Sequence, residues 1–156
     1  MTTSAIWHIL VPVCFALILN GIIYTKQWSQ QSNKSLDHIQ YIPSGYIVGT
    51  IWVVLFGLLG YTHYLLYPNP SVFIIYITFV YCLSYPILTR LLYNKAPLYN
   101  TVALLIIITA AFIVLHQNKK AFVFMIPLMM WVSYVNIIDS INCARIYNTT
   151  SINNGE

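Results

Sequence analysis

Charged side chains are scarce in this chain. Only 6% of its 156 residues are charged, with seven Lys and Arg against three Asp and Glu, whereas 59% are hydrophobic. A soluble domain has about a quarter of its residues charged. This chain could not cover its own surface with polar groups, so we predict an integral membrane protein. The basic residues are too few and scattered to form the basic patch that nucleic acid binding needs, and we expect no nucleic acid partner.

Motifs for catalysis and metal binding are also lacking. The sequence contains no Ser/His/Asp set, no HExxH and no Gly-rich phosphate loop, so an enzyme activity has no motif to rest on, and we expect no cofactor and no bound metal. The three cysteines lie in apolar stretches without paired spacing, which favours small buried residues. His8, His63 and His116 are isolated in the sequence and no pair has metal-ligand spacing, so we expect single hydrogen-bonded histidines rather than metal ligands.

Long apolar stretches are what the chain has instead. About 20 apolar residues carry a helix across a bilayer, and five stretches qualify: residues 5–24, 46–67, 71–93, 98–116 and 121–145. The breaks between the last four are short, so neighbouring helices are expected to be antiparallel. We predict an all-α membrane protein, a five transmembrane helix bundle formed by one domain (1–147). A long polar loop at 25–42 and a disordered polar tail at 148–156 complete this prediction.

Basic residues are distributed unequally over the two predicted membrane sides. The side that holds loop 25–42 and the C-terminus collects five of them: Lys26, Lys34, Arg90, Lys95 and Arg145. The opposite side has Lys119 and Lys120. Because basic loops stay in the cytosol, loop 25–42 and the C-terminus are predicted to be cytosolic. The glycosylation sequons at Asn33 and Asn148 are therefore expected to remain unused.

The stretch 46–67 carries residues that a helix merely filling a membrane does not need. At 100° per residue, one face collects Gly49, Trp52, Val53, Phe56, Gly60 and His63, with Gly57 and Tyr64 beside it. Two interpretations are open. Small residues allow neighbouring helices to pack closely, or the glycines leave room for a ligand while the aromatic rings form the flat walls of a pocket.

The stretch 121–145 has a polar face, with the residues Ser133, Asn136, Asp139, Ser140 and Cys143. An ionisable residue within a span is a functional hypothesis by default, because charge in lipid is costly. Asp139 lies near the predicted cytosolic end, however, so a hydrogen-bonded or interfacial carboxylate is the alternative. Trp131 lies on a different face, together with Tyr134, Val135 and Ile138.

The order of these motifs resembles that of the translocator protein family, also called TspO, tryptophan-rich sensory proteins or peripheral benzodiazepine receptors. PSGYIVGTIWVVLFGLLGYTHYLLY (43–67) is similar to that family's second helix, roughly P-P-x-W-V-F-G-P-V-W-T-x-L-Y-x-x-M-G-Y-x-x-Y-L-V. SYPILTRLLY (84–93) is similar to W-x-W-P-P-x-F-F-G, and PLMMWVSYVNIIDSIN (127–142) to P-Y-x-x-W-x-x-F-x-x-x-L-N. The resemblance covers residues 43–145.

This resemblance implies a five-helix bundle with an internal ligand pocket, lidded by the first loop. It implies a membrane receptor or carrier for a hydrophobic ligand, with porphyrin or haem first and sterols or benzodiazepine-type ligands next. The alternative is an enzyme that promotes light-dependent porphyrin degradation through Trp52 and Trp131, and a third reading is a partner platform without a small ligand. The residues expected to bind the ligand are Gly49, Trp52, Val53, Phe56, Gly60, Tyr85, Trp131, Tyr134 and Ile138.

The chain departs from the family pattern at several positions. The first loop lacks the family's lysine-proline-tryptophan run, and Thr50 replaces a proline. Ser140 stands where a tyrosine is usual, which puts sterol binding there in doubt. The expected partners are therefore a porphyrin or another hydrophobic small molecule and the lipid bilayer. A homodimer is implied only because family members can dimerise.

Overall fold

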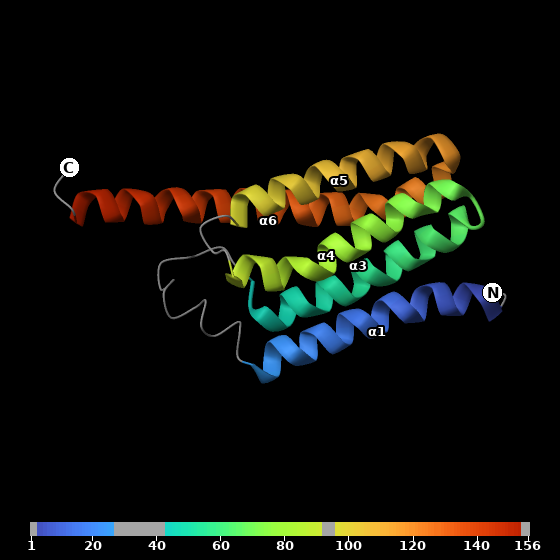
Figure 1. Ribbon diagram of the computed structural model, residues 1–156, viewed down its shortest axis with the longest axis horizontal. Helices are drawn as coiled ribbons and strands as arrows, with labels where there is room; N and C mark the ends of the chain where they lie inside the picture. Colours follow the sequence, from blue (N-terminus) through green and yellow to red (C-terminus); the bar gives the residue numbers. More distant parts are fainter. Residues whose placement is uncertain (1–2, 27–42, 92–95, 154–156) are drawn as a thin grey trace.

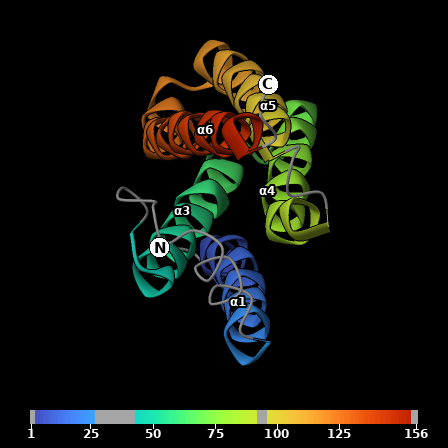
Figure 2. The same ribbon diagram turned by 90° about the vertical axis from the view of Figure 1, so that its left-hand side faces the viewer.

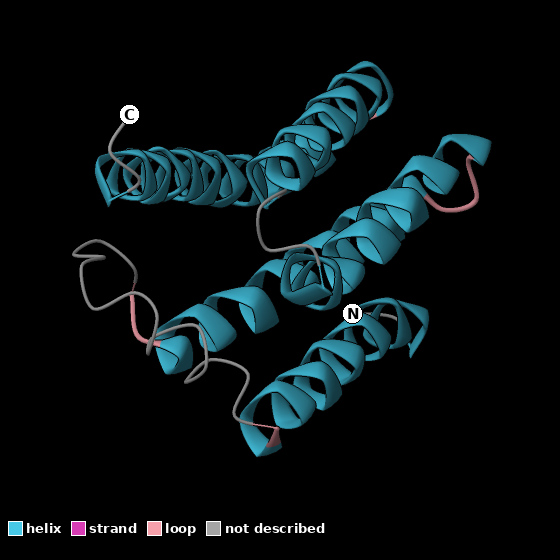
Figure 3. Ribbon diagram, turned by 60° about the vertical axis from the view of Figure 1, so that its left-hand side comes forward, coloured by secondary structure: helices cyan, strands magenta, loops and turns pink. Residues whose placement is uncertain are grey.

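Five long helices make up almost all of the described chain. The computed structural model describes residues 3–26, 43–91 and 96–153. The helices are α1 (Thr3–Thr25), α3 (Gly45–Leu66), α4 (Phe73–Leu91), α5 (Ala96–Gln117) and α6 (Lys119–Asn153), with a short 3-10 helix η1 (Pro70–Val72) before α4 (Figure 1). Each of the five is long and apolar enough to cross a membrane. The predicted fold class is confirmed, and the described residues contain no strand (Figure 3).

The helices are arranged in a ring. Helix α1 packs along α3, α3 also contacts α6, α6 lies along α5, and α5 packs against α4. Smaller contacts of α4 with α3 and α1 close the ring. Viewed along the bundle, α1 lies on the side away from α5 and α6 (Figure 2). Because α1 depends mainly on α3, the α1–α3 contact decides how the first helix is held.

The two ends of the bundle carry different connections. The N-terminus, the α3–α4 turn and the α5–α6 turn lie at one end, whereas α6 reaches beyond the other helices at the opposite end (Figure 1). Asn118 ties the two turns together, because its amide donates to the carbonyl oxygen of Leu65 (3.2 Å) while its side-chain oxygen accepts from the backbone N–H of Lys120 and Ala121. Asn118 thus caps α6 and fixes α6 to the end of α3.

Small and aliphatic residues form the contact between α5 and α6. Ala103, Ala110 and Ala111 are almost fully buried on α5, and Met125 and Val132 are buried on α6. Small side chains let helix backbones approach closely, which is what drives helix association in lipid. Large apolar side chains such as Leu105 and Met130 are exposed on the outside of the bundle, as expected for side chains that contact lipid.

The helix boundaries differ from the predicted spans by a few residues, except at the C-terminal end. Helix α6 continues to Asn153, so the predicted polar tail does not begin at residue 148. No proline or glycine interrupts the chain between Asp139 and Asn153, so nothing in this stretch ends the helix earlier. Most of the lid-like loop predicted at 25–42 lies outside the described residues, as does the sequon at Asn33.

Candidate functional site

The glycines of α3 face α1 rather than an open pocket. A Cβ atom on Gly60 would fall far inside van der Waals distance of the backbone carbonyl oxygen of His8. Gly49 lies against Asn20, whose amide donates to the carbonyl oxygen of Gly49 at 2.9 Å. These two glycines, expected among the ligand-binding residues, therefore sit where α1 takes up the space. Their role is thus close packing between α1 and α3, to which Asn20 adds an interhelical hydrogen bond.

The aromatic residues of the same α3 face fill the interior of the bundle. Phe56 is 3% exposed and packs edge-to-face on Phe79 of α4, with ring centroids 5.1 Å apart. Trp52 stacks beside Phe56 at 5.6 Å, and both Trp52 and Val53 are partly buried against the hydrophobic core. Edge-to-face and tilted pairs are favourable ring arrangements. These residues contribute to the core of the bundle, and none of them lines the groove described next.

An apolar groove lies between α3 and α6. It has a volume of about 470 Å³ and is lined by Thr50, Ile51, Val54, Leu55, Leu58, Pro127, Met130, Trp131 and Tyr134. Val54 and Met130 are more than half exposed, so the groove opens on the outer, lipid-facing side of the bundle. Small-molecule sites commonly measure 300–1,000 Å³ and are mostly apolar. The groove therefore has the size and lining of a site for a hydrophobic molecule.

Trp131 supplies an aromatic wall to this groove. Its ring stacks on that of Tyr134, with centroids 5.6 Å apart. Its indole Nε1–H is buried and has no hydrogen-bond partner. On the α3 wall of the groove, the hydroxyl of Thr50 donates a hydrogen bond to the backbone carbonyl oxygen of Tyr46.

Two of the nine predicted ligand-binding residues, Trp131 and Tyr134, line the groove. The sequence analysis did not predict the α3 wall of the groove. Thr50, Val54 and Leu58 lie on the helix face beside the glycines, and the pattern of Val54 and Leu58 is that of ordinary lipid-facing residues. On α6 a signal was present: Pro127, Met130, Trp131 and Tyr134 follow the i, i+3, i+4, i+7 spacing of a single helix face.

Tyr85 and Asp139 belong to a separate polar cluster that joins three helices. The hydroxyl of Tyr85 on α4 donates to the Asp139 carboxylate on α6 at 2.8 Å. The side-chain amide of Asn100 on α5, which is 2% exposed, donates to the same oxygen. Ile138, the residue before Asp139 in the sequence, is partly buried and does not line the groove. Asp139 is therefore a hydrogen-bonded carboxylate, which was one of the two alternatives that the sequence left open.

Five apolar helices and a lateral apolar groove define a multi-pass integral membrane protein. The TspO/MBR family model matches residues 8–140, which is most of the chain. The protein belongs to the TspO/MBR family. No curated protein and no solved structure matches the chain. Family membership supports a role in membrane ligand binding or transport.

Proposed function

We propose that this protein is a membrane receptor or carrier for a flat hydrophobic ligand, a porphyrin or haem before a sterol or a benzodiazepine-type compound. The groove between α3 and α6, with Trp131 in its wall, is the observation that carries the proposal. An indole face and the Tyr134 ring offer a planar apolar surface on which a planar ligand stacks. A hydrophobic ligand that partitions into the bilayer reaches such a groove from the side.

The composition of the groove favours binding over chemistry. Apart from Trp131, Tyr134 and Thr50, its lining residues are aliphatic, Met or Pro, so it supplies apolar and stacking surface rather than acid–base groups. The enzyme alternative requires two tryptophans, and Trp52 does not line the groove.

The cytosolic orientation of the C-terminus and a homodimer stay predictions.

Quenching of tryptophan fluorescence tests the proposal. Protoporphyrin is titrated into the purified protein in detergent micelles, and we expect saturable quenching in the wild type. Trp131→Phe replaces the large indole by a smaller ring, and we expect the loss of stacking surface to weaken binding roughly tenfold, about 1.4 kcal/mol. Trp7→Phe is the matched control, because Trp7 is 64% exposed on α1.

Three results would contradict or redirect the proposal. Absence of saturable quenching would favour a partner platform that binds no small ligand. Equal affinity in Trp131→Phe and Trp7→Phe would remove the groove as the site. Consumption of bound porphyrin under illumination, abolished by Trp131→Phe, would favour the enzyme alternative instead.

A further inference from the structure

Two histidines from different helices meet at the end of the bundle that carries the N-terminus. The Nδ1 atoms of His8 on α1 and His63 on α3 are 2.7 Å apart, and the ring centroids are 4.6 Å apart. The sequence separates the two residues by 55 positions, so no local spacing indicated that the two expected hydrogen-bonded histidines would be each other's partner. At this distance one Nδ1–H donates to the other Nδ1, and the tautomer decides which ring is the donor.

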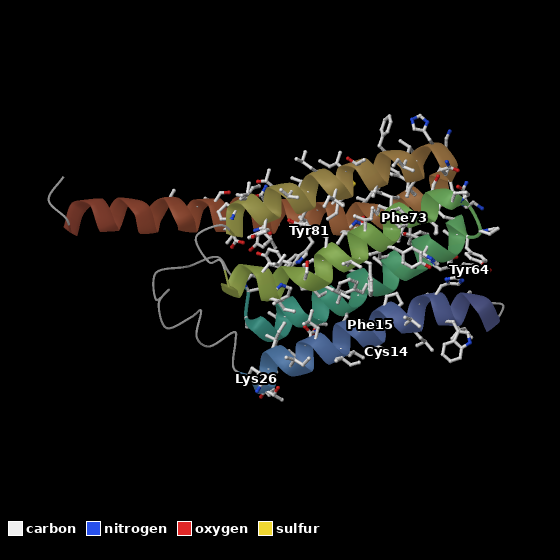
Figure 4. All side chains as sticks on the ribbon, viewed as in Figure 1. Cys14, Phe15, Lys26, Tyr64, Phe73 and Tyr81 are labelled. Carbon is white, nitrogen blue, oxygen red and sulfur yellow. The ribbon has the colours of Figure 1, made fainter. Side chains whose placement is uncertain are left out.

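The backbone holds this pair in place. Gly60 receives the carbonyl group of His8 directly against α3, almost one helical turn before His63. His63 is 8% exposed, and its Nε2 atom is buried without a hydrogen-bond partner. Aromatic rings surround the pair: Tyr67 contacts both imidazoles, and Tyr76 packs edge-to-face on His63 with ring centroids 4.8 Å apart. Tyr64 marks this end of the bundle in Figure 4. The two imidazoles are therefore preorganised rather than free to rotate.

The pair also lies where a hydrated ion can arrive. His8 is five residues after the start of α1 and His63 is three residues before the end of α3. At 1.5 Å per residue, both lie within about 8 Å of a helix end. The rings of Tyr67 and Tyr76 are half or more exposed, so they shield the pair without closing off this end of the bundle.

We propose that His8 and His63 form a binding site for a late first-row transition-metal ion, with Cu²⁺ bound more tightly than Zn²⁺. Neutral imidazole is the commonest metal ligand in proteins and suits copper and zinc. With metal–nitrogen distances of about 2.0–2.1 Å, neighbouring nitrogens lie about 2.9 Å apart on a tetragonal Cu²⁺ ion and about 3.3 Å apart on a tetrahedral Zn²⁺ ion. From 2.7 Å, the two Nδ1 atoms have to separate by about 0.2 Å for Cu²⁺ and about 0.6 Å for Zn²⁺. The ion takes the place of the Nδ1 proton between the rings, and that proton is taken up at Nε2 of the same ring, so both imidazoles stay neutral and carry their proton on Nε2.

The site has two protein ligands and leaves the remaining positions to water or a small solute. Among the described residues, no group of three or more His, Cys, Asp or Glu side chains could hold a metal. Such an open two-ligand site exchanges its ion with the surroundings more readily than a closed structural site. This proposal does not depend on porphyrin binding, because the histidine pair does not line the α3–α6 groove.

Copper binding to the full-length protein tests the proposal. The protein is purified without a polyhistidine tag, stripped with a chelator, dialysed against Cu²⁺ and analysed by elemental mass spectrometry and electron paramagnetic resonance. We expect one ion per chain, a spectrum with hyperfine splitting from two nitrogens, and weaker binding at acidic pH, since the ligands must be neutral. His8→Ala and His63→Ala are each expected to lower the affinity at least tenfold.

The controls separate this site from other histidines and from misfolding. His116→Ala is the matched control, because His116 is exposed at the same end of the bundle and packs on Phe112 rather than on another imidazole. The His116→Ala variant is expected to bind one Cu²⁺ ion as the wild type does, and so is the His38→Ala, His116→Ala double variant. His63→Gln is the second variant in case His63→Ala does not fold. A wild-type spectrum without nitrogen splitting, or equal copper binding by wild type and the His8→Ala, His63→Ala double variant, overturns the proposal.

Discussion

At the residue scale, the glycines of α3 show how a small side chain decides a helix contact. Gly60 accepts the backbone of α1 where any larger residue would collide, whereas Gly57 is 3.5 Å from Val13, an ordinary contact distance for an added Cβ. The glycines on this face are therefore not equally indispensable. The cost of substitution depends on which atom occupies the space, and at Gly60 that atom belongs to a backbone that cannot rotate away.

Gly60→Ala is expected to destabilise the protein by about 1–3 kcal/mol, the usual cost of overpacking a filled contact. The added methyl group forces α1 away from α3, since the carbonyl oxygen of His8 cannot move independently of its helix. Thermal unfolding in detergent measures the effect. Gly21→Ala is the matched control: nothing lies within 4 Å of a Cβ at Gly21, so stability is expected to stay equal or rise slightly. Equal midpoints for both variants would contradict the close contact.

At the element scale, polar clusters join helices that apolar packing alone leaves undirected. In lipid, an apolar side chain is as well solvated outside the bundle as inside, so interhelical hydrogen bonds help to fix which faces meet. The cluster of Tyr85, Asn100 and Asp139 does this for α4, α5 and α6, and the pair of Asn20 and Gly49 does it for α1 and α3.

Tyr85→Phe is expected to lower the stability of the bundle by about 0.5–2 kcal/mol, the range measured for interhelical hydrogen bonds in membranes. The substitution removes one donor from the Asp139 carboxylate and keeps the ring. Tyr46→Phe serves as control, because Tyr46 is 84% exposed. Unfolding in mixed detergent, compared between the two variants, gives the measurement. If Tyr85→Phe unfolds no earlier than Tyr46→Phe, the hydroxyl does not support the cluster.

The same physics explains which elements could be predicted from the sequence. Five spans could be predicted because length and hydropathy are local properties of the chain. The pairing of faces could not, since Val54 in the groove wall and Val80 on the outside are both exposed valines within an apolar helix. The pairing of His8 with His63 depends on the α1–α3 contact, and no local pattern around either residue indicates it. Trp131 was predicted for the ligand site because the family resemblance singled it out.

At the scale of the whole molecule, five spans put the ends of the chain on opposite membrane faces. The N-terminus and the α5–α6 turn share one end of the bundle (Figure 1). Lys119 and Lys120 are the basic residues at that end, and Lys26 follows the last residue of α1 at the other (Figure 4). The orientation is a prediction from the sequence, and it matters for the metal-site proposal because it decides which compartment the histidine pair faces.

Glycosylation in microsomes measures this orientation. An N-terminal extension that carries a sequon is expected to be glycosylated, because the predicted N-terminal side is the lumenal one. The same extension at the C-terminus is the matched reporter and is expected to stay unmodified, as are Asn33 and Asn148. Modification of the C-terminal reporter alone would invert the topology and place the histidine pair on the cytosolic side.

The central claim is that the groove between α3 and α6 binds the ligand, and filling the groove tests it most directly. Val54→Trp adds a large side chain to the groove wall, and because Val54 is 56% exposed the fold is expected to tolerate it. Val80→Trp adds the same side chain at a 64% exposed valine of α4 that does not line the groove. Saturation binding of protoporphyrin, followed by its absorbance, is compared among wild type and both variants. The account expects Val54→Trp to lose at least tenfold in affinity, about 1.4 kcal/mol, and Val80→Trp to bind as the wild type does. Equal affinity in all three proteins would contradict it.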